Sequence, residues 1–268
     1  MASPLVEQVI AASGGDPLRL SLYMSSVAMA LTTLGGLGVL FAGDLRDPRR
    51  FSLLIDLGLG FSSGVMLVAS FTSLLLPSIE SYGVTAPLLG LALGALVIHV
   101  INMVVPHEHF VKGYEGPAAG IRKLKAAWLV AFAIIIHNLP EGLSIGAASS
   151  YSGVNGVTIG LAIAIQDIPE GLAVSIPVYA STGSTWKGIF YAWLSGFSEV
   201  LTALPAAALS KYSIILLPYM MGFGAGAMIY VVSHEALPET HRSGHEDKAT
   251  LSFFAGFIVM LILDTLLG

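Results

Sequence analysis

The sequence predicts an all-α integral membrane protein that crosses a bilayer eight times. Hydrophobic residues make up 55% of the 268 residues and charged residues only 11%, whereas a soluble domain carries about 25% charged residues. Apolar runs of about 20 residues, long enough to span the hydrocarbon core, recur along the whole chain. Stretches such as residues 91–105 are apolar nearly throughout and do not alternate, which favours helices over a β-barrel.

We predict a single transmembrane domain that covers residues 1–268. The approximate spans are 20–42, 53–76, 86–105, 126–149, 157–179, 186–209, 213–236 and 251–267. Short connections with turn-forming residues, such as 153–156, join most of the spans. Residues 106–125 and 238–250 form longer polar connections.

The distribution of basic residues predicts the orientation of the chain. Connections after odd-numbered spans carry ten Lys and Arg residues, whereas the opposite side carries only Arg19 and Lys211. Because basic loops stay in the cytoplasm, we expect a multi-pass protein of the plasma (inner) membrane with both termini extracytoplasmic.

The sequence lacks two features, cysteine residues and a basic face, and each lack excludes a class of partner or ligand. The chain has no cysteine, which excludes disulfides and thiolate ligands. It has no basic face of the kind that binds nucleic acid. We therefore expect the lipid bilayer as a partner, with no nucleic acid and no organic cofactor. A homodimer is compatible with the sequence.

A short internal repeat lies in spans four and five. Residues 137–143 (HNLPEGL) and 166–172 (QDIPEGL) share one template and begin 29 residues apart. Because the two spans run in opposite directions, the copies can face each other at similar depth. Inverted elements of this kind build a central site in many transporters.

The polar residues of each copy converge on one helix face, because they are spaced three or four positions apart. They are His137, Asn138 and Glu141 in the first copy and Gln166, Asp167 and Glu170 in the second. Glu199 lies near the middle of span six, and Met66 lies midway along span two, where its thioether could join a site.

Charged groups at this depth cost roughly 2.5–3.5 kcal/mol each. No Lys or Arg lies deep within a span to neutralise them, apart from Lys187 at the edge of one. A divalent cation would supply the missing positive charge. Oxygen and nitrogen ligands without thiolates suit Zn²⁺, and also Fe²⁺, Mn²⁺, Co²⁺ or Cd²⁺. The sequence therefore predicts a metal site between spans four and five, at the centre of the bundle.

The two motifs resemble the signature pair of the ZIP (Zrt/Irt-like) divalent-metal transporters, and the span count and orientation are similar to the prokaryotic members. The resemblance implies transport of divalent transition metals, Zn²⁺ first among them, into the cytoplasm. The path would lie between spans one, four, five and six and spans two, three, seven and eight.

The resemblance also implies a binuclear metal centre with bound Zn²⁺ or Cd²⁺. One site would use His137, Glu141, Gln166, Glu170 and Met66. The other would use Asn138, Asp167 and Glu199, with Glu141 and Glu170 bridging both ions. His234 and Glu235 resemble residues on the exit route.

Other functions are open on the sequence alone. Residues 142–146 match G-x-S-x-G, so an intramembrane serine protease could use Ser144 with a histidine base such as His234. The motif lies inside a predicted helix and not on a strand-to-helix elbow, which argues against this alternative. A proton- or sodium-coupled carrier of organic substrates would not explain why the six repeat residues converge. A simple metal channel is a further alternative. We expect no enzyme activity.

We interpret His99, which lies outside the two motifs, as an interhelical hydrogen-bonding residue.

Overall fold

The computed structural model describes residues 3–41, 48–105, 107–109, 113–115, 126–242 and 244–267. Side chains are described in these ranges except for 48–51, 107–109, 113–115, 126–135 and 181. The elements are α1 (Pro4–Ser13), α2 (Pro17–Gly36), η1 (Leu37–Phe41), α3 (Pro48–Ala69), η2 (Ser70–Leu75), α4 (Leu76–Tyr82), α5 (Thr85–Val104), β1 (His107–His109), β2 (Gly113–Glu115), α6 (Ala126–Tyr151), α7 (Gly153–Thr182), α8 (Thr185–Tyr212), η4 (Ile214–Leu216), α9 (Leu217–Val231), η5 (Val232–Ala236), α10 (Leu237–Thr240) and α11 (Glu246–Leu267).

The predicted all-α membrane fold is confirmed. Seven helical stretches in the described part of the chain are long and apolar enough to cross a bilayer. They are Pro17–Phe41, Ser52–Tyr82, Thr85–Val104, Gly153–Ala180, Thr185–Tyr212, Ile214–Thr240 and Glu246–Leu267. The remaining expected span, 126–149, coincides with α6, a helix of 26 residues. The side chains of its first ten residues lie outside the described part, so the count of eight stays a prediction.

The structure differs from the predicted boundaries at several places. Residues 153–156 form the first turn of α7 and not a connection, since the Ser152 hydroxyl accepts a hydrogen bond from the Asn155 N–H at 3.0 Å. The connection at 238–250 contains α10 and the start of α11. The connection at 106–125 contains β1 and β2, which pair antiparallel. The sequence analysis also missed α1, which begins at the cap Ser3.

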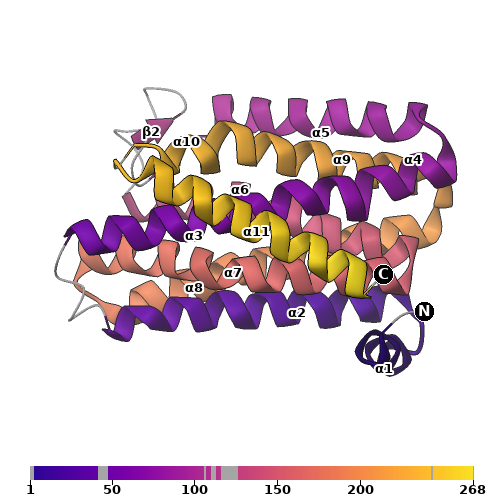
Figure 1. Ribbon diagram of the computed structural model, residues 1–268, viewed down its shortest axis with the longest axis horizontal. Coiled ribbons are helices and arrows are strands. Elements are labelled where there is room, and N and C mark those ends of the chain that lie inside the picture. Colours follow the sequence, from indigo (N-terminus) through magenta and orange to yellow (C-terminus); the bar gives the residue numbers. More distant parts are fainter. Residues whose placement is uncertain are drawn as a thin grey trace.

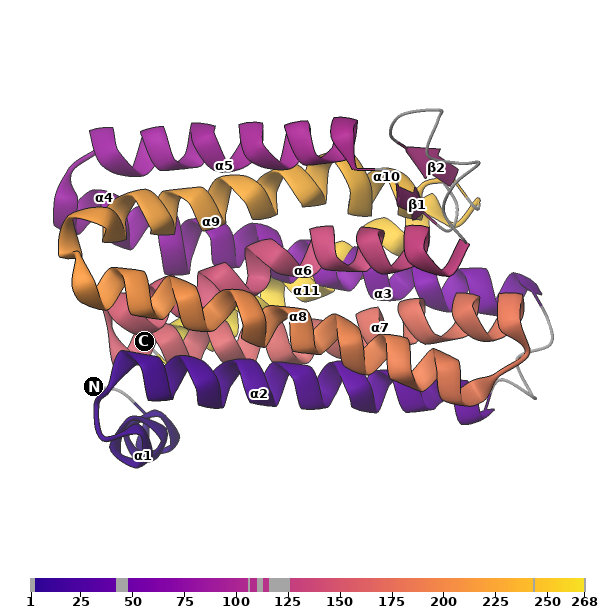
Figure 2. The same cartoon turned by 180° about the vertical axis from the view of Figure 1, so that it is seen from behind.

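The long helices pack in two groups (Figures 1 and 2). Helices α2, α6, α7 and α8 pack against one another in the first group, whereas α5 packs on α9 and α3 on α11 in the second. The short helix α1 and the end of α11 lie at the same end of the bundle (Figure 1). Helices α6 and α7, which carry the repeat, contact members of both groups.

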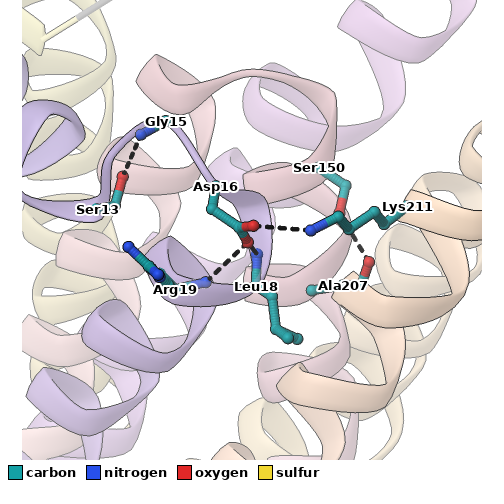
Figure 3. Close-up of polar contacts among 8 residues, drawn as sticks. All are labelled: Ser13, Gly15, Asp16, Leu18, Arg19, Ser150, Ala207 and Lys211. Atoms are coloured by element: carbon teal, nitrogen blue, oxygen red, sulfur yellow. Dashed lines mark hydrogen bonds and ion pairs between the residues drawn. The ribbon is translucent and has the colours of Figure 1, made fainter.

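An ion pair joins two helices at the end of the first group (Figure 3). Asp16 caps α2 by accepting a hydrogen bond from the Leu18 N–H at 2.8 Å. Its other carboxylate oxygen accepts one from the Lys211 ammonium of α8 at 2.7 Å. The hydrogen bond from Lys211 lowers the pKa of the Asp16 carboxyl from its ordinary value, and the hydrogen bond from the Leu18 N–H acts in the same direction.

Two π-helical segments interrupt the second group of helices. The segments η2 and η5 each end just before a short α-helix with a proline in its first turn, Pro77 in α4 and Pro238 in α10. Proline has no N–H to donate to an α-helical ladder, so the preceding turn widens. Such segments are often found at functional sites, and η5 carries both His234 and Glu235.

Candidate metal centre

Carboxylates from the two motif copies lie together inside the bundle. One oxygen from each of Glu141, Asp167 and Glu170 lies within 4.8 Å of the others. Glu141 is on α6, whereas Asp167 and Glu170 are on α7. The Gln166 amide of α7 donates a hydrogen bond to Glu141 Oε1 at 2.6 Å. Polar side chains of the two motif copies therefore converge, as expected. Each helix also contains a proline at the site, Pro140 in α6 and Pro169 in α7.

Asn138 connects the centre to α8. Its Nδ2 donates to Glu199 Oε1 at 2.9 Å and lies 3.0 Å from Ser195 Oγ. Glu199 is fully buried, and Asn138 is nearly so. The structure thus places Glu199 beside the first motif copy, as the sequence analysis expected, and adds Ser195 as a partner that it did not foresee.

Hydroxyl groups from two further helices hold the carboxylates of α7. Thr32 of α2 donates to Asp167 Oδ2 at 3.2 Å. Ser62 of α3 donates to Glu170 Oε1. Both residues escaped the sequence analysis, because Ser and Thr in apolar helices ordinarily bond their own backbone. The sequence held one signal that pointed to Ser62. This residue precedes Met66, the proposed thioether ligand, by one helical turn.

The centre contains more hydrogen-bond acceptors than donors. Four of its buried oxygens have no hydrogen-bond partner in the described part of the chain, namely Glu141 Oε2, Gln166 Oε1, Asp167 Oδ1 and Glu199 Oε2. A buried polar atom without a partner costs about 1–3 kcal/mol. All four are oxygens, the ligand atoms that a divalent cation accepts. The residues present therefore fit a metal ion.

The glycine of each motif copy lets another helix approach the centre. A Cβ atom on Gly142 would lie 2.3 Å from the backbone oxygen of Glu199, and one on Gly171 would lie 1.9 Å from that of Thr32. No real Cβ makes such contacts. The repeated Pro-Glu-Gly therefore brings α8 beside the first motif copy and α2 beside the second.

His137 contacts Glu235, one of the two residues that the resemblance placed on an exit route. Its Nε2 lies 3.2 Å from Glu235 Oε2 of η5, and the two residues form an ion pair when the imidazole is protonated. The ring of His234 lies against Tyr230 with centroids 5.1 Å apart. Met66 is buried, with only 2% of its surface exposed. The roles of Met66 and His234 in metal binding stay predictions.

His99 has the interhelical role that we predicted. Its Nδ1 lies 2.9 Å from the hydroxyl oxygen of Tyr230, which joins α5 to α9. The two rings also meet edge to face, with centroids 5.9 Å apart. This histidine therefore serves helix packing.

Ser144 does not have the surroundings of a nucleophile. Its hydroxyl donates to the backbone oxygen of Pro140 at 2.6 Å and lies 3.2 Å from Met228 Sδ. The residue is fully buried in the middle of α6. The G-x-S-x-G match therefore marks helix packing, and the protease alternative has no support.

Comparison with known proteins gives a consistent result. A family model described as ZIP zinc transporter matches residues 106–264. The chain is 43% identical over 223 residues to the zinc transporter ZIPB of Bordetella bronchiseptica, covering 80% of this chain and 72% of that protein. It is 38% identical over 259 residues to the zinc transporter GufA of Myxococcus xanthus, covering 92% and 98%. It is 31% identical to the human zinc transporter ZIP11 over 306 residues, covering 80% and 89%.

Proposed function

The chain belongs to the ZIP zinc transporter family, and on that premise we propose that it carries divalent transition-metal cations across the membrane into the cytoplasm. Zn²⁺ is the proposed main substrate, and Cd²⁺, Fe²⁺, Mn²⁺ and Co²⁺ share the chemistry that these ligands accept. We further propose that the protein lies in the plasma (inner) membrane with both termini outside. A homodimer stays a prediction.

This proposal rests on the buried oxygens of the centre that have no hydrogen-bond donor in the described part of the chain. Glu141, Asp167 and Glu170 have oxygens within 4.8 Å of one another, and no Lys or Arg of the described chain makes an ion pair with them. Three carboxylates so close together in a low-dielectric interior repel one another strongly unless positive charge arrives. A divalent cation removes this repulsion and supplies the partners that the unbonded oxygens lack.

Within the centre we propose two neighbouring metal positions. The first uses His137, Glu141, Gln166 and Glu170, with Met66 as an added thioether ligand. The second uses Asn138, Asp167 and Glu199, and Glu141 and Glu170 bridge both ions. The contacts of Asn138 with Glu199 and of Gln166 with Glu141 support this grouping, because each pair lies within 3 Å.

The proposed exit follows Glu235 and His234. The 3.2 Å contact between His137 Nε2 and Glu235 Oε2 supports this route. His137 is a proposed ligand of the centre, and Glu235 is the first residue of the proposed exit, so the two are in direct contact. No covalent chemistry is needed. The protein binds, desolvates and releases its substrate.

Metal uptake into reconstituted vesicles tests the proposal. Glu141→Ala and Glu170→Ala should each abolish Zn²⁺ uptake, because each removes a bridging carboxylate. Ser144→Ala is the matched control, since it alters the same helix one turn from Glu141 without touching the centre. Uptake that stays at the native level in both glutamate variants would overturn the proposal.

A further inference from the structure

We propose that Ser62 of α3 is a positioning residue for the metal centre, because its hydroxyl holds the Glu170 carboxylate in the orientation that receives the ion. The inference rests on the transport function proposed above and deepens it. Part of the affinity for metal then comes from a helix that carries neither motif copy.

Glu170 is the acid of the central cluster that its surroundings confine least. It is only partly buried, whereas Glu141 and Asp167 are buried. A glutamate side chain has several rotatable torsions, and fixing them when an ion binds costs conformational entropy. A partner that fixes the carboxylate beforehand therefore strengthens metal binding.

Ser62 is such a partner for Glu170. Its hydroxyl donates a hydrogen bond to Glu170 Oε1, and Glu170 has no other hydrogen-bond partner in the described part of the chain. Ser62 itself is buried, with 1% of its surface exposed, so water does not compete for this hydroxyl. Hydrogen bonds to a charged acceptor are stronger than those between neutral groups. The single contact can therefore hold the carboxylate.

Ser62 does not make the hydrogen bond that a serine in a helix ordinarily makes. A hydroxyl has only one hydrogen to donate. On the same span, Ser63, Ser70 and Thr72 each donate to the backbone carbonyl four residues earlier. Ser62 instead donates to Glu170 on another helix. This hydroxyl therefore serves a contact between helices and not its own turn.

Backbone packing places Ser62 opposite Glu170. Gly58, Ser62 and Met66 follow one another at intervals of four residues, so they lie on one face of α3. A Cβ atom on Gly58 would lie 2.7 Å from the Cβ of Pro169. The small residue thus lets α3 approach α7 one turn before Ser62, and the hydroxyl then meets the carboxylate that follows the proline.

The hydrogen bond also joins the two groups of helices. Helix α3 packs on α11 in the second group, whereas α7 belongs to the first group. Glu141, Gln166 and Asp167 all lie on α6 and α7. Through Ser62, the orientation of Glu170 depends on how the second group packs against the first.

A bound ion leaves this hydrogen bond in place. A carboxylate offers about four lone-pair positions, so Glu170 can accept the Ser62 hydrogen and still present oxygen lone pairs to metal. Hydrogen bonds from surrounding residues orient ligating carboxylates, and their loss typically lowers metal affinity by about 10–100-fold. We expect a loss in this range when the Ser62 hydroxyl is removed.

Equilibrium binding of Zn²⁺ to the full chain in detergent tests the role of the hydroxyl. Ser62→Thr and Ser62→Val form a matched pair, because the two side chains have nearly the same shape and only threonine has a hydroxyl. Ser62→Val and Ser62→Ala should weaken Zn²⁺ binding about tenfold or more. Ser62→Thr should bind Zn²⁺ almost as the native chain does.

Ser63→Ala is the control for the loss of a buried hydroxyl from α3. Its hydrogen bond goes to the Leu59 carbonyl of the same helix at 2.7 Å. Because this bond does not reach the centre, the Kd for Zn²⁺ should not change.

The Tm of the metal-free variants shows whether position 62 tolerates an added methyl group. If it does, equal Kd values for Ser62→Thr and Ser62→Val overturn the proposal, because packing alone would not distinguish them. If it does not, Ser62→Ala adds no atom and decides the question: a Kd equal to that of Ser63→Ala overturns the proposal.

Zn²⁺ uptake by vesicles, measured in parallel, separates this inference from the transport function. Ser62→Ala should raise the KM for uptake by about the same factor as the Kd. A native chain that takes up Zn²⁺, with a Ser62→Ala chain of native Kd, would refute the positioning role alone. A native chain that takes up no Zn²⁺, with the binding series as expected, would instead refute the transport function.

Discussion

The glycine of the second motif copy should not tolerate even one added methyl group. A Cβ atom at Gly171 would lie 1.9 Å from the backbone oxygen of Thr32, 2.8 Å from its carbonyl carbon and 3.0 Å from the Gly36 nitrogen. All three are backbone atoms, so no side chain can rotate away. To reach the 3.4 Å of ordinary contact, α7 and α2 must separate locally by about 1.5 Å.

That separation reaches the metal centre. The Thr32 hydroxyl now lies 3.2 Å from Asp167 Oδ2, and an added 1.5 Å, roughly, takes the pair beyond hydrogen-bond distance. Overpacking costs about 1–3 kcal/mol and the lost hydrogen bond about 1 kcal/mol more. We expect Gly171→Ala to destabilise the protein by about 2–4 kcal/mol and to reduce Zn²⁺ uptake severely.

The assays are thermal unfolding in detergent and Zn²⁺ uptake by vesicles, with Gly153→Ala as the control. Gly153 lies on the same helix, but the three atoms nearest to its added Cβ would all belong to the Ile10 side chain, at 2.8–3.3 Å. Because the end of an isoleucine can rotate, this variant should stay close to the native protein. Equal losses in the two variants would refute the argument that helix approach at Gly171 shapes the centre.

Three further predictions concern the Ser144 hydrogen bond, the ion pair of Asp16 with Lys211, and the effect of Zn²⁺ on stability. Ser144→Ala should lose about 1 kcal/mol of stability with its hydrogen bond to Pro140 and retain Zn²⁺ uptake; an uptake loss as large as that of Glu141→Ala would contradict the packing role. Asp16→Asn keeps a good N-cap but removes the charge that pairs with Lys211. Because the folded-state pKa of Asp16 is lowered, the stability that this charge adds is present above the ordinary carboxyl pKa of 3.8 and is lost as pH falls through the lowered value. The Tm of the native protein should therefore exceed that of Asp16→Asn at neutral pH and approach it in acid, and a difference independent of pH would count against the ion pair. Zn²⁺ at a hundred times its Kd should stabilise the native chain by about 2.7 kcal/mol in a thermal-shift assay, and an equal shift in Glu141→Ala/Glu170→Ala would place the bound ion elsewhere.

The sequence by itself determined the helices and the pairing of the two motif copies. Apolar length is a local property, so seven of the expected spans coincide with described helices, with ends that differ by up to six residues. Within each motif copy the glutamate, Glu141 or Glu170, follows its partner side chains by three or four residues, which is also a local property. Two antiparallel neighbours with the same template must then meet at similar depth. The boundaries near 153–156 failed because a single cap, Ser152, outweighs the turn preference of the glycines that follow.

Tertiary structure alone decided which side chains complete the centre. In the sequence, Thr32, Ser62 and Ser195 resemble the other hydroxyl residues of the spans. Bonding to the backbone of the same helix does not separate the two kinds, since Ser63 bonds the Leu59 carbonyl and Thr32 also bonds the Ala28 carbonyl. Which hydroxyl reaches a polar side chain of the centre depends on how each helix is rotated and how closely it approaches its neighbour. Those quantities come from contacts between segments far apart in the chain. For the same reason the sequence did not predict the hydrogen bond between Asn102 and Glu235. These residues lie 133 positions apart and meet only after α5 packs on α9.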